Sequence, residues 1–152
     1  MIKRLNTGDA AAAPHVASAE ADRPASPPQP SQRTCLIVDD SRMIRKVARR
    51  IVESVGYAVV EAENGEEGLA RCRAAMPHLV ITDWNMPVMS GIDFVTALRA
   101  IPTERRPRVV FCTTNSGARD IHKGIEAGAD EYVIKPFDDA SLVSRLQAIG
   151  AA

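Results

Sequence analysis

Short apolar runs alternate with stretches of helical periodicity from residue 34 onward. The runs predict five strands, at residues 35–38, 58–61, 78–82, 108–112 and 131–134. Each run is almost continuously apolar, as is typical of strands in a parallel sheet whose two faces are both buried. Because one helical stretch separates each pair of consecutive runs, the pattern predicts an α/β fold with a doubly wound parallel sheet.

The helical stretches predict five helices, at residues 41–55, 64–76, 91–101, 116–127 and 138–149. Asn64 and Glu67 stand at capping-box spacing at the start of the second. The first helix has its apolar positions on one face. Its other face carries four basic residues that we expect to point to solvent, Arg42, Arg45, Lys46 and Arg49. For five strands we expect the flavodoxin-like order 2-1-3-4-5, which makes strands one and three neighbours.

The first 33 residues differ from the rest, because they hold half of the ten prolines and no aromatic side chain. Such a segment buries too little apolar surface to offset the entropy lost on ordering. We therefore expect a disordered extension over residues 1–33 and one domain over residues 34–152. A proline-rich docking peptide is the alternative role for the extension.

Composition narrows the class of protein further. The chain has 152 residues, 45% of them hydrophobic and 25% charged, which suits one globular domain. Its net charge of zero gives no field to hold nucleic acid, and no apolar run approaches the roughly 20 residues of a membrane span. Without a signal peptide, we expect a cytoplasmic protein. Cys35, Cys72 and Cys112 have no metal-ligand spacing and are expected to be buried.

Reactive side chains follow four of the five predicted strands: Asp39 and Asp40, Asp83, Thr113, and Lys135. Open α/β sheets bind ligands at this edge, and the expected strand order puts Asp39 and Asp40 beside Asp83. Three neighbouring carboxylates repel one another and need a cation between them, and oxygen ligands favour Mg²⁺. For Asp40 alone, the alternative is an N-cap of the first helix together with Ser41.

Asp83 begins a loop in which Pro87 and Gly91 fix a rigid path back into the third helix. A carboxylate held there beside Mg²⁺ can attack a phosphoryl group and form an aspartyl-phosphate. Lys135 could neutralise one phosphoryl oxygen, and the Thr113 hydroxyl could donate to another. We expect a cis bond between Lys135 and Pro136 to aim the lysine inward, the alternative being a surface lysine before an ordinary turn.

A wider set of residues then resembles a known family in order and spacing: Asp39-Asp40, Asp83-Trp84-Asn85-Met86-Pro87, Gly91, Thr113, Tyr132 and Lys135-Pro136-Phe137. The family is the receiver domain of two-component response regulators, and the chain is similar to its CheY-like single-domain members. The resemblance implies that Asp83 accepts a phosphoryl group from a sensor histidine kinase or a histidine phosphotransfer protein. It also implies four Mg²⁺ ligands, from Asp39, Asp40, Asp83 and the main-chain carbonyl of Asn85.

The resemblance also concerns the residues that change conformation on phosphorylation, called the switch, and those that affect the rate of dephosphorylation. It implies that Thr113 and Tyr132 form the switch, and that Asn85 and Asn115 occupy positions where the family varies this rate. Thr114 departs from the small residue usual in the family, so we expect it to narrow access to Asp83. Trp84 lies beside the nucleophile and could report metal binding by fluorescence, the alternative being an apolar lid.

We expect a phosphorylation-controlled protein–protein switch of chemotaxis or motility, a phosphoacceptor rather than an enzyme, whose output face comprises the fourth helix, fifth strand and fifth helix. The sequence stops soon after the last predicted helix, so no DNA-binding module is expected. One alternative is a phosphorelay intermediate. Another is an adaptor that binds a cyclic dinucleotide through Arg105, Arg106, Arg108 and the basic face of the first helix. A haloacid-dehalogenase-like phosphatase would need Asp-x-Asp after its first strand, and this chain has Asp39-Asp40.

Overall fold

The computed structural model describes residues 32–114 and 117–152. Five strands and five helices alternate along them: β2 (Thr34–Val38), α2 (Arg42–Ser54), β3 (Ala58–Ala62), α3 (Gly65–Ala74), β4 (Leu79–Asp83), α4 (Gly91–Arg99), β5 (Arg108–Thr113), α5 (Ala118–Ala127), β6 (Glu131–Ile134) and α6 (Asp139–Ala148). All strand pairs are parallel, in the order β3-β2-β4-β5-β6. The predicted flavodoxin-like order 2-1-3-4-5 is therefore confirmed.

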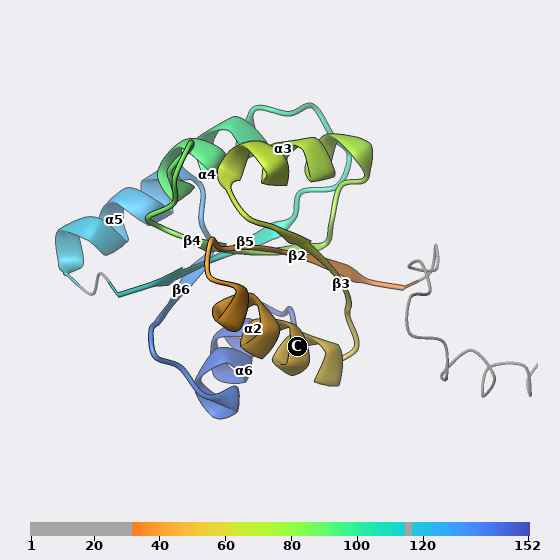
Figure 1. Cartoon of the computed structure of the whole chain (residues 1–152), viewed down its shortest axis with the longest axis vertical. Helices are drawn as coiled ribbons and strands as arrows, with labels where there is room; N and C mark the ends of the chain where they lie inside the picture. Colours follow the sequence, from red (N-terminus) through yellow and green to blue (C-terminus); the bar gives the residue numbers. More distant parts are fainter. Residues whose placement is uncertain (1–31, 115–116) are drawn as a thin grey trace, which may run out of the picture.

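Helices cover both faces of the sheet, α2 and α6 on one face and α3, α4 and α5 on the other (Figure 1). Each face has its own apolar cluster, one around Ile51, Ile81 and Leu142 and the other around Leu36, Phe94 and Phe111. Successive strand residues alternate between the two clusters, which is why the strands are continuously apolar. The three cysteines are buried, as predicted.

Most predicted element boundaries agree with the structure to within two residues. Asn64 caps α3 by accepting from Glu67 N, but the Glu67 carboxylate accepts from Glu63 N at 2.7 Å, one residue before the expected partner. The third predicted helix ends at Arg99 rather than next to Pro102. The expected start of the fourth helix, Ser116, lies outside the described residues, and α5 begins at Ala118.

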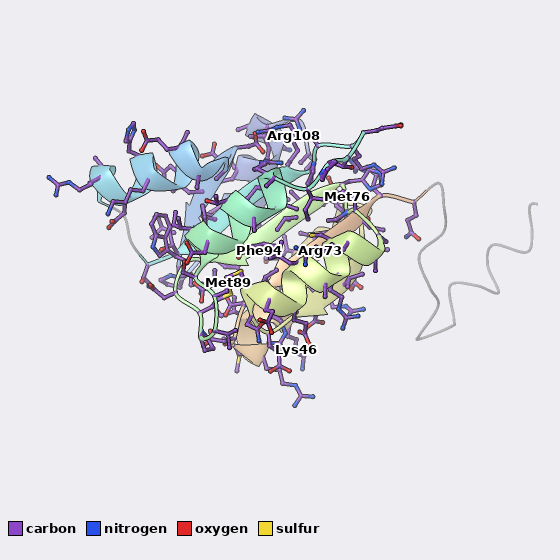
Figure 2. The ribbon with its side chains drawn as sticks, turned by 90° about the horizontal axis from the view of Figure 1, so that it is seen from above. Lys46, Arg73, Met76, Met89, Phe94 and Arg108 are labelled. Carbon is purple, nitrogen blue, oxygen red and sulfur yellow. The ribbon has the colours of Figure 1, made fainter. Side chains whose placement is uncertain are left out.

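The layer of α3 and α4 also anchors the loop after β4. Phe94 of α4 points toward α3 (Figure 2), where a Cβ at Gly68 would lie 3.0 Å from its ring. Met89 of the loop packs against Gly65, whose own Cβ would lie 3.0 Å from the Met89 side chain. The glycines of α3 therefore let the β4–α4 loop and α4 pack closely.

Of the predicted extension, residues 1–31 lie outside the described residues. Arg33 stacks its guanidinium 4.4 Å from the centre of the Tyr57 ring and donates to the Val55 carbonyl at 3.3 Å. The packed domain thus includes the last residue of that segment. No helix among the described residues is long and apolar enough to cross a membrane.

Candidate functional site

The parallel strands deliver the predicted site residues to one edge of the sheet. Asp83 ends β4 and Thr113 ends β5, while Asp39 and Lys135 directly follow β2 and β6. Because these strands are adjacent in the sheet, their carboxyl ends meet. Ligand oxygens of Asp39, Asp40 and Asp83 all lie within 4.8 Å of one another. The predicted clustering of the three carboxylates is therefore confirmed.

Asp39 is 2% exposed, and donors hold both of its carboxylate oxygens. Oδ1 accepts from Ser41 N at 2.8 Å, and Oδ2 lies 2.9 Å from Lys135 Nζ. The peptide bond between Lys135 and Pro136 is cis, and Lys135 points into the site as expected. A surface lysine is thus excluded, because its ammonium is paired with two site carboxylates.

Asp83 is 8% exposed, and two donors hold its Oδ1. Trp84 N donates to this oxygen at 2.8 Å, and Lys135 Nζ lies 3.1 Å from it. Burial and the neighbouring Asp39 carboxylate raise the pKa of Asp83, against the opposing effect of Lys135. Burial lowers the pKa of Lys135, but Asp39 and Asp83 outweigh it and hold the pKa above its ordinary value.

The loop from Asp83 to α4 is held close to the site by its backbone. Gly91 N donates to Trp84 O at 2.8 Å, and a Cβ at Gly91 would collide with the carbonyl oxygen of Asp83. Val88 has a φ of 73° and is bracketed by a Met89 N to Pro87 O bond of 2.7 Å, the pattern of a γ-turn. A β-branched residue rarely adopts this conformation, so the surrounding contacts enforce the path of the loop.

Asp40 is exposed, and the N-cap of α2 is Ser41, whose Oγ accepts from Ile44 N at 3.2 Å. The capping alternative for Asp40 is therefore wrong. Asn85 is exposed two residues after Asp83, and the role of its carbonyl as a ligand stays a prediction. Clustered carboxylates suit Mg²⁺, which prefers oxygen ligands, takes few of them from the protein and completes its coordination with water. The cluster therefore fits this cation.

The two predicted switch residues lie on adjacent strands. Thr113 is 2% exposed, and its carbonyl accepts from Lys135 N at 2.8 Å. Tyr132 is half-buried against the cluster under α3, α4 and α5, and Arg145 stacks 4.7 Å from the centre of its ring. Thr114 is exposed, and Asn115 lies outside the described residues.

Trp84, which directly follows Asp83, contacts both β5 and α5. Its ring lies 4.9 Å from that of Phe111, and a Cβ at Gly124 of α5 would lie 3.1 Å from it. The indole is thus packed between β5 and α5 and does not lie over the site as a lid.

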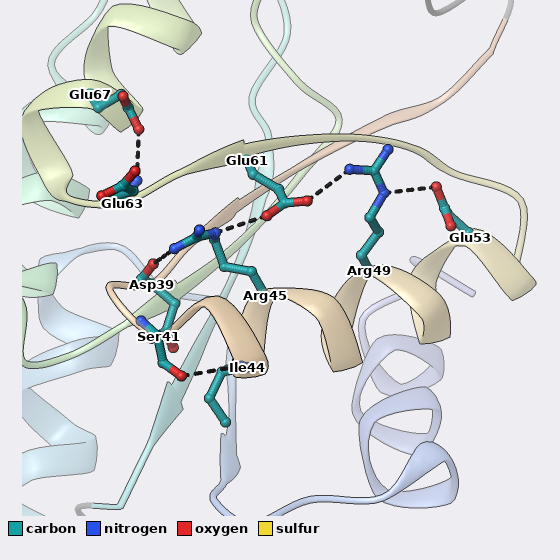
Figure 3. Close-up of polar contacts among 9 residues, drawn as sticks. All are labelled: Asp39, Ser41, Ile44, Arg45, Arg49, Glu53, Glu61, Glu63 and Glu67. Atoms are coloured by element: carbon teal, nitrogen blue, oxygen red, sulfur yellow. Dashed lines mark hydrogen bonds and ion pairs between the residues drawn. The ribbon is translucent and has the colours of Figure 1, made fainter. Parts of the chain in front are cut away.

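One contact at the site does not follow from the sequence pattern. Arg45, expected on the solvent face of α2, has a side chain only 11% exposed, so this expectation is wrong. Its Nη1 donates to the Asp39 carbonyl at 2.7 Å, and its Nε lies 2.8 Å from Glu61 (Figure 3). A carboxylate inside the apolar strand β3 was the available signal, because a half-buried acid needs a cationic partner.

The arginines considered for a cyclic dinucleotide are largely engaged by the protein. Arg106 pairs with Asp130 at 3.2 Å, and Arg105 donates to the Met76 carbonyl at 3.1 Å. On α2, Arg45 and Arg49 both bind Glu61. These contacts leave fewer arginine side chains available to bind the phosphates of a cyclic dinucleotide.

Known proteins share this sequence and fold. A sequence model of the response regulator receiver domain matches residues 35–147. Chemotaxis protein CheY1 of Helicobacter pylori (strain J99) is 34% identical over 116 residues, which cover 75% of this chain and 94% of that protein. The phosphate regulon transcriptional regulatory protein PhoB of Escherichia coli is 34% identical over 117 residues, 77% of this chain but only 51% of PhoB.

Solved structures agree with these relatives. The chemotaxis response regulator CheY4 of Vibrio cholerae superimposes with a TM-score of 0.73 at 33% identity, covering 78% of this chain and 99% of CheY4. A CheY-like receiver domain from Methylobacillus flagellatus gives a TM-score of 0.69 at 29% identity, covering 78% of this chain and 99% of that one. With the matching family model, the strand order and the acidic cluster at the sheet edge, these likenesses show that the chain belongs to the response regulator receiver domain family.

Proposed function

We propose that the chain is a phosphoacceptor signalling protein in which Asp83 takes a phosphoryl group from a histidine kinase or a histidine phosphotransfer protein. One observation carries the proposal. The Asp83 carboxylate is buried beside two other carboxylates within 4.8 Å, and Lys135 Nζ contacts it at 3.1 Å. Phosphoryl transfer depends mainly on positioning and charge neutralisation. Clustered carboxylates and one lysine at the carboxyl ends of parallel strands suit this reaction.

In the transfer step, a carboxylate oxygen of Asp83 attacks the phosphorus of a phosphohistidine. The P–O bond forms as the P–N bond breaks, and the electron pair returns to the histidine nitrogen. Asp39, Asp40 and Asp83 would hold Mg²⁺, with the Asn85 carbonyl as a further ligand, and the cation supplies charge neutralisation. Lys135 and the Thr113 hydroxyl would bind the other phosphoryl oxygens. The protein's part is positioning, so we class it as a phosphoacceptor rather than an enzyme.

The output would be a change in the face formed by α5, β6 and α6. Thr113 and Tyr132 lie on adjacent strands, so a movement of Thr113 toward a phosphoryl group would alter the space beside Tyr132. We propose cytoplasmic protein–protein signalling of the chemotaxis or motility kind. The similarity to CheY1 and CheY4, two chemotaxis proteins, supports this pathway. The transcriptional regulator PhoB is equally similar to this chain in sequence, so another output, such as a phosphorelay, is the competing role.

The decisive experiment is radiolabelled phosphoryl transfer from purified histidine kinases to the wild type and to Asp83→Asn. The amide keeps the shape of the side chain but cannot act as the nucleophile, so we expect label on the wild type alone. Equal labelling of the wild type and of Asp83→Asn, mapped in both proteins to the same other residue, would reject Asp83 as the acceptor. The same assay across many kinases would identify the donor and hence the pathway.

A further inference from the structure

One peptide bond joins two of the three clustered carboxylates, because Asp40 directly follows Asp39. Arg45 Nη1 donates to the oxygen of this peptide, the Asp39 carbonyl, at 2.7 Å. A peptide group is planar, so a bond that holds its oxygen also holds the amide nitrogen and Cα of Asp40. Among the described residues no side chain is bonded to the exposed Asp40 carboxylate. Its direction therefore depends on the backbone, which Arg45 holds together with the bond from Ser41 N to Asp39 Oδ1.

The guanidinium of Arg45 is itself fixed from the opposite side. Its Nε lies 2.8 Å from Glu61 Oε1, and Glu61 Oε2 lies 2.7 Å from Arg49 Nη1 (Figure 3). Arg49 Nε in turn lies 3.1 Å from Glu53. The chain of contacts runs along α2 and β3 and ends at the corner between β2 and α2. With only 11% of its side chain exposed, Arg45 has little freedom to leave this position.

We infer that Arg45 is a positioning residue, oriented by Glu61, which sets the direction of Asp40 relative to Asp39 and so shapes the cation site. The inference rests on the proposed function for the identity of the cation. A planar guanidinium has donors that point in different directions, and here one serves a carboxylate and another a carbonyl. A lysine has the charge but not this fork, so it could not hold both partners in the same geometry.

Positioning and simple electrostatics predict opposite results when the charge of Arg45 is removed. A cation near the acidic cluster repels Mg²⁺, so its loss should tighten Mg²⁺ binding if only charge matters. If Arg45 positions Asp40, its loss should weaken binding. Residues that orient metal ligands typically affect metal affinity about 10- to 100-fold.

The test is a titration of MgCl₂ into isotope-labelled protein, followed by NMR at the amides of Asp39, Asp40 and Ser41. We expect about tenfold weaker Mg²⁺ binding in Arg45→Met and in Arg45→Lys. Lys46→Met is the matched control, since it removes the neighbouring, exposed cation of α2 and leaves the contacts of Arg45 with Glu61 and the Asp39 carbonyl intact. We expect its affinity to be unchanged or slightly higher. Circular dichroism would verify that each variant is folded, and Arg45→Lys keeps the test valid if Arg45→Met does not fold.

Equal or tighter Mg²⁺ binding by folded Arg45→Met would overturn the inference, as would full affinity in Arg45→Lys. A wild type that binds no Mg²⁺ would instead reject the metal site of the proposed function. The metal-free spectra would then decide the positioning role by themselves. We expect the Asp40 and Ser41 amide signals to shift or broaden in the two Arg45 variants and to stay unchanged in Lys46→Met. Unchanged signals in the Arg45 variants would overturn the inference independently of the cation.

Discussion

At the scale of single residues, Asp83 is placed where its charge is unfavourable without a bound cation. Burial and the Asp39 carboxylate raise its pKa, and Lys135 compensates only in part because it is shared with Asp39. A raised carboxyl pKa means that the folded protein binds a proton more readily than the unfolded chain. The ionised form of Asp83 therefore lowers the free energy of unfolding at neutral pH.

We predict that Asp83→Asn raises the free energy of unfolding in metal-free buffer, because it removes this unfavourable charge and keeps the side-chain volume. Under the proposed function, we also expect Mg²⁺ to stabilise the wild type but not Asp83→Asn. Urea unfolding at pH 7, with and without MgCl₂, would measure both effects. Glu104→Gln is the control, since Glu104 is an exposed carboxylate on a loop. A metal-free Asp83→Asn less stable than the wild type would contradict the prediction.

Individual residues also show what the sequence could and could not predict. Asp39, Asp83 and Lys135 follow apolar strands, and parallel strands bring such positions together, so their cluster was predictable. The contact of Arg45 with the Asp39 carbonyl was not. Helical periodicity indicates which face a residue occupies, whereas this contact depends on how α2 lies over β3 and on a carboxylate in another strand.

At the scale of elements, α5 approaches the sheet closely because Gly124 has no side chain. A Cβ there would lie 3.0 Å from Phe111 and 3.1 Å from Trp84, closer than ordinary contacts. From the sequence alone, a glycine inside a predicted helix indicates only a weaker helix. Its packing role depends on Trp84, which belongs to a distant loop, and so the sequence alone could not indicate it.

We predict that Gly124→Ala lowers the free energy of unfolding by up to about 2 kcal/mol. Alanine gains about 1 kcal/mol of helix propensity, but inserting a methyl group into a packed contact costs about 1–3 kcal/mol. The emission of Trp84, the only tryptophan, should also change. Lys123→Ala on the exposed side of α5 is the control. A stabilised Gly124→Ala with unchanged emission would show that α5 is free to move away from Trp84.

At the amino ends of the strands, a titratable histidine forms a hydrogen bond that joins β2 and β4. His78, just before β4, accepts from Thr34 N of β2 through its Nδ1 at 3.1 Å. Burial, then Arg105 and Arg33, lower the pKa of His78. A protonated ring would lose the acceptor and face these two cations, so the folded state favours the neutral form.

The ordinary pKa of a histidine side chain is 6.5. We predict that His78 makes the protein less stable as the pH falls below this value. In that range the unfolded chain binds the proton and the folded protein does not, so stability decreases with falling pH until the lowered pKa is reached. His78→Asn keeps an acceptor near Thr34 N but does not titrate. Urea unfolding from pH 7.5 to 5.5 should give a smaller loss for this variant, and equal losses in both proteins would contradict the prediction.

At the scale of the whole molecule, the edge that holds Asp83 and the face formed by α5, β6 and α6 are connected through β5 and β6. Thr113 pairs with Ile134, and Lys135, which contacts Asp83, follows directly on β6. Tyr132 lies on the same strand, and Arg145 of α6 stacks on its ring at 4.7 Å while lying 3.5 Å from Glu131. Arg145 therefore favours the half-buried position of Tyr132 seen here. If Tyr132 can also occupy a second rotamer, a phosphoryl group at Asp83 can change this face only by its different affinity for the two forms of the protein.

We predict that Arg145→Met increases the population of a Tyr132 rotamer other than the half-buried one seen here about two- to fivefold, because a cation–π contact at a partly exposed site contributes about 0.5–1 kcal/mol. Methionine keeps an apolar stem against the ring, so the charge is the main loss. The measurement is NMR of the Tyr132 ring in the metal-free protein and with Mg²⁺ and beryllofluoride. Arg119→Met on the exposed surface of α5 should leave the Tyr132 signals unchanged. If the Tyr132 signals responded neither to Arg145→Met nor to beryllofluoride, Tyr132 would be a packed core residue, and the signal would have to leave Asp83 by another part of the fold.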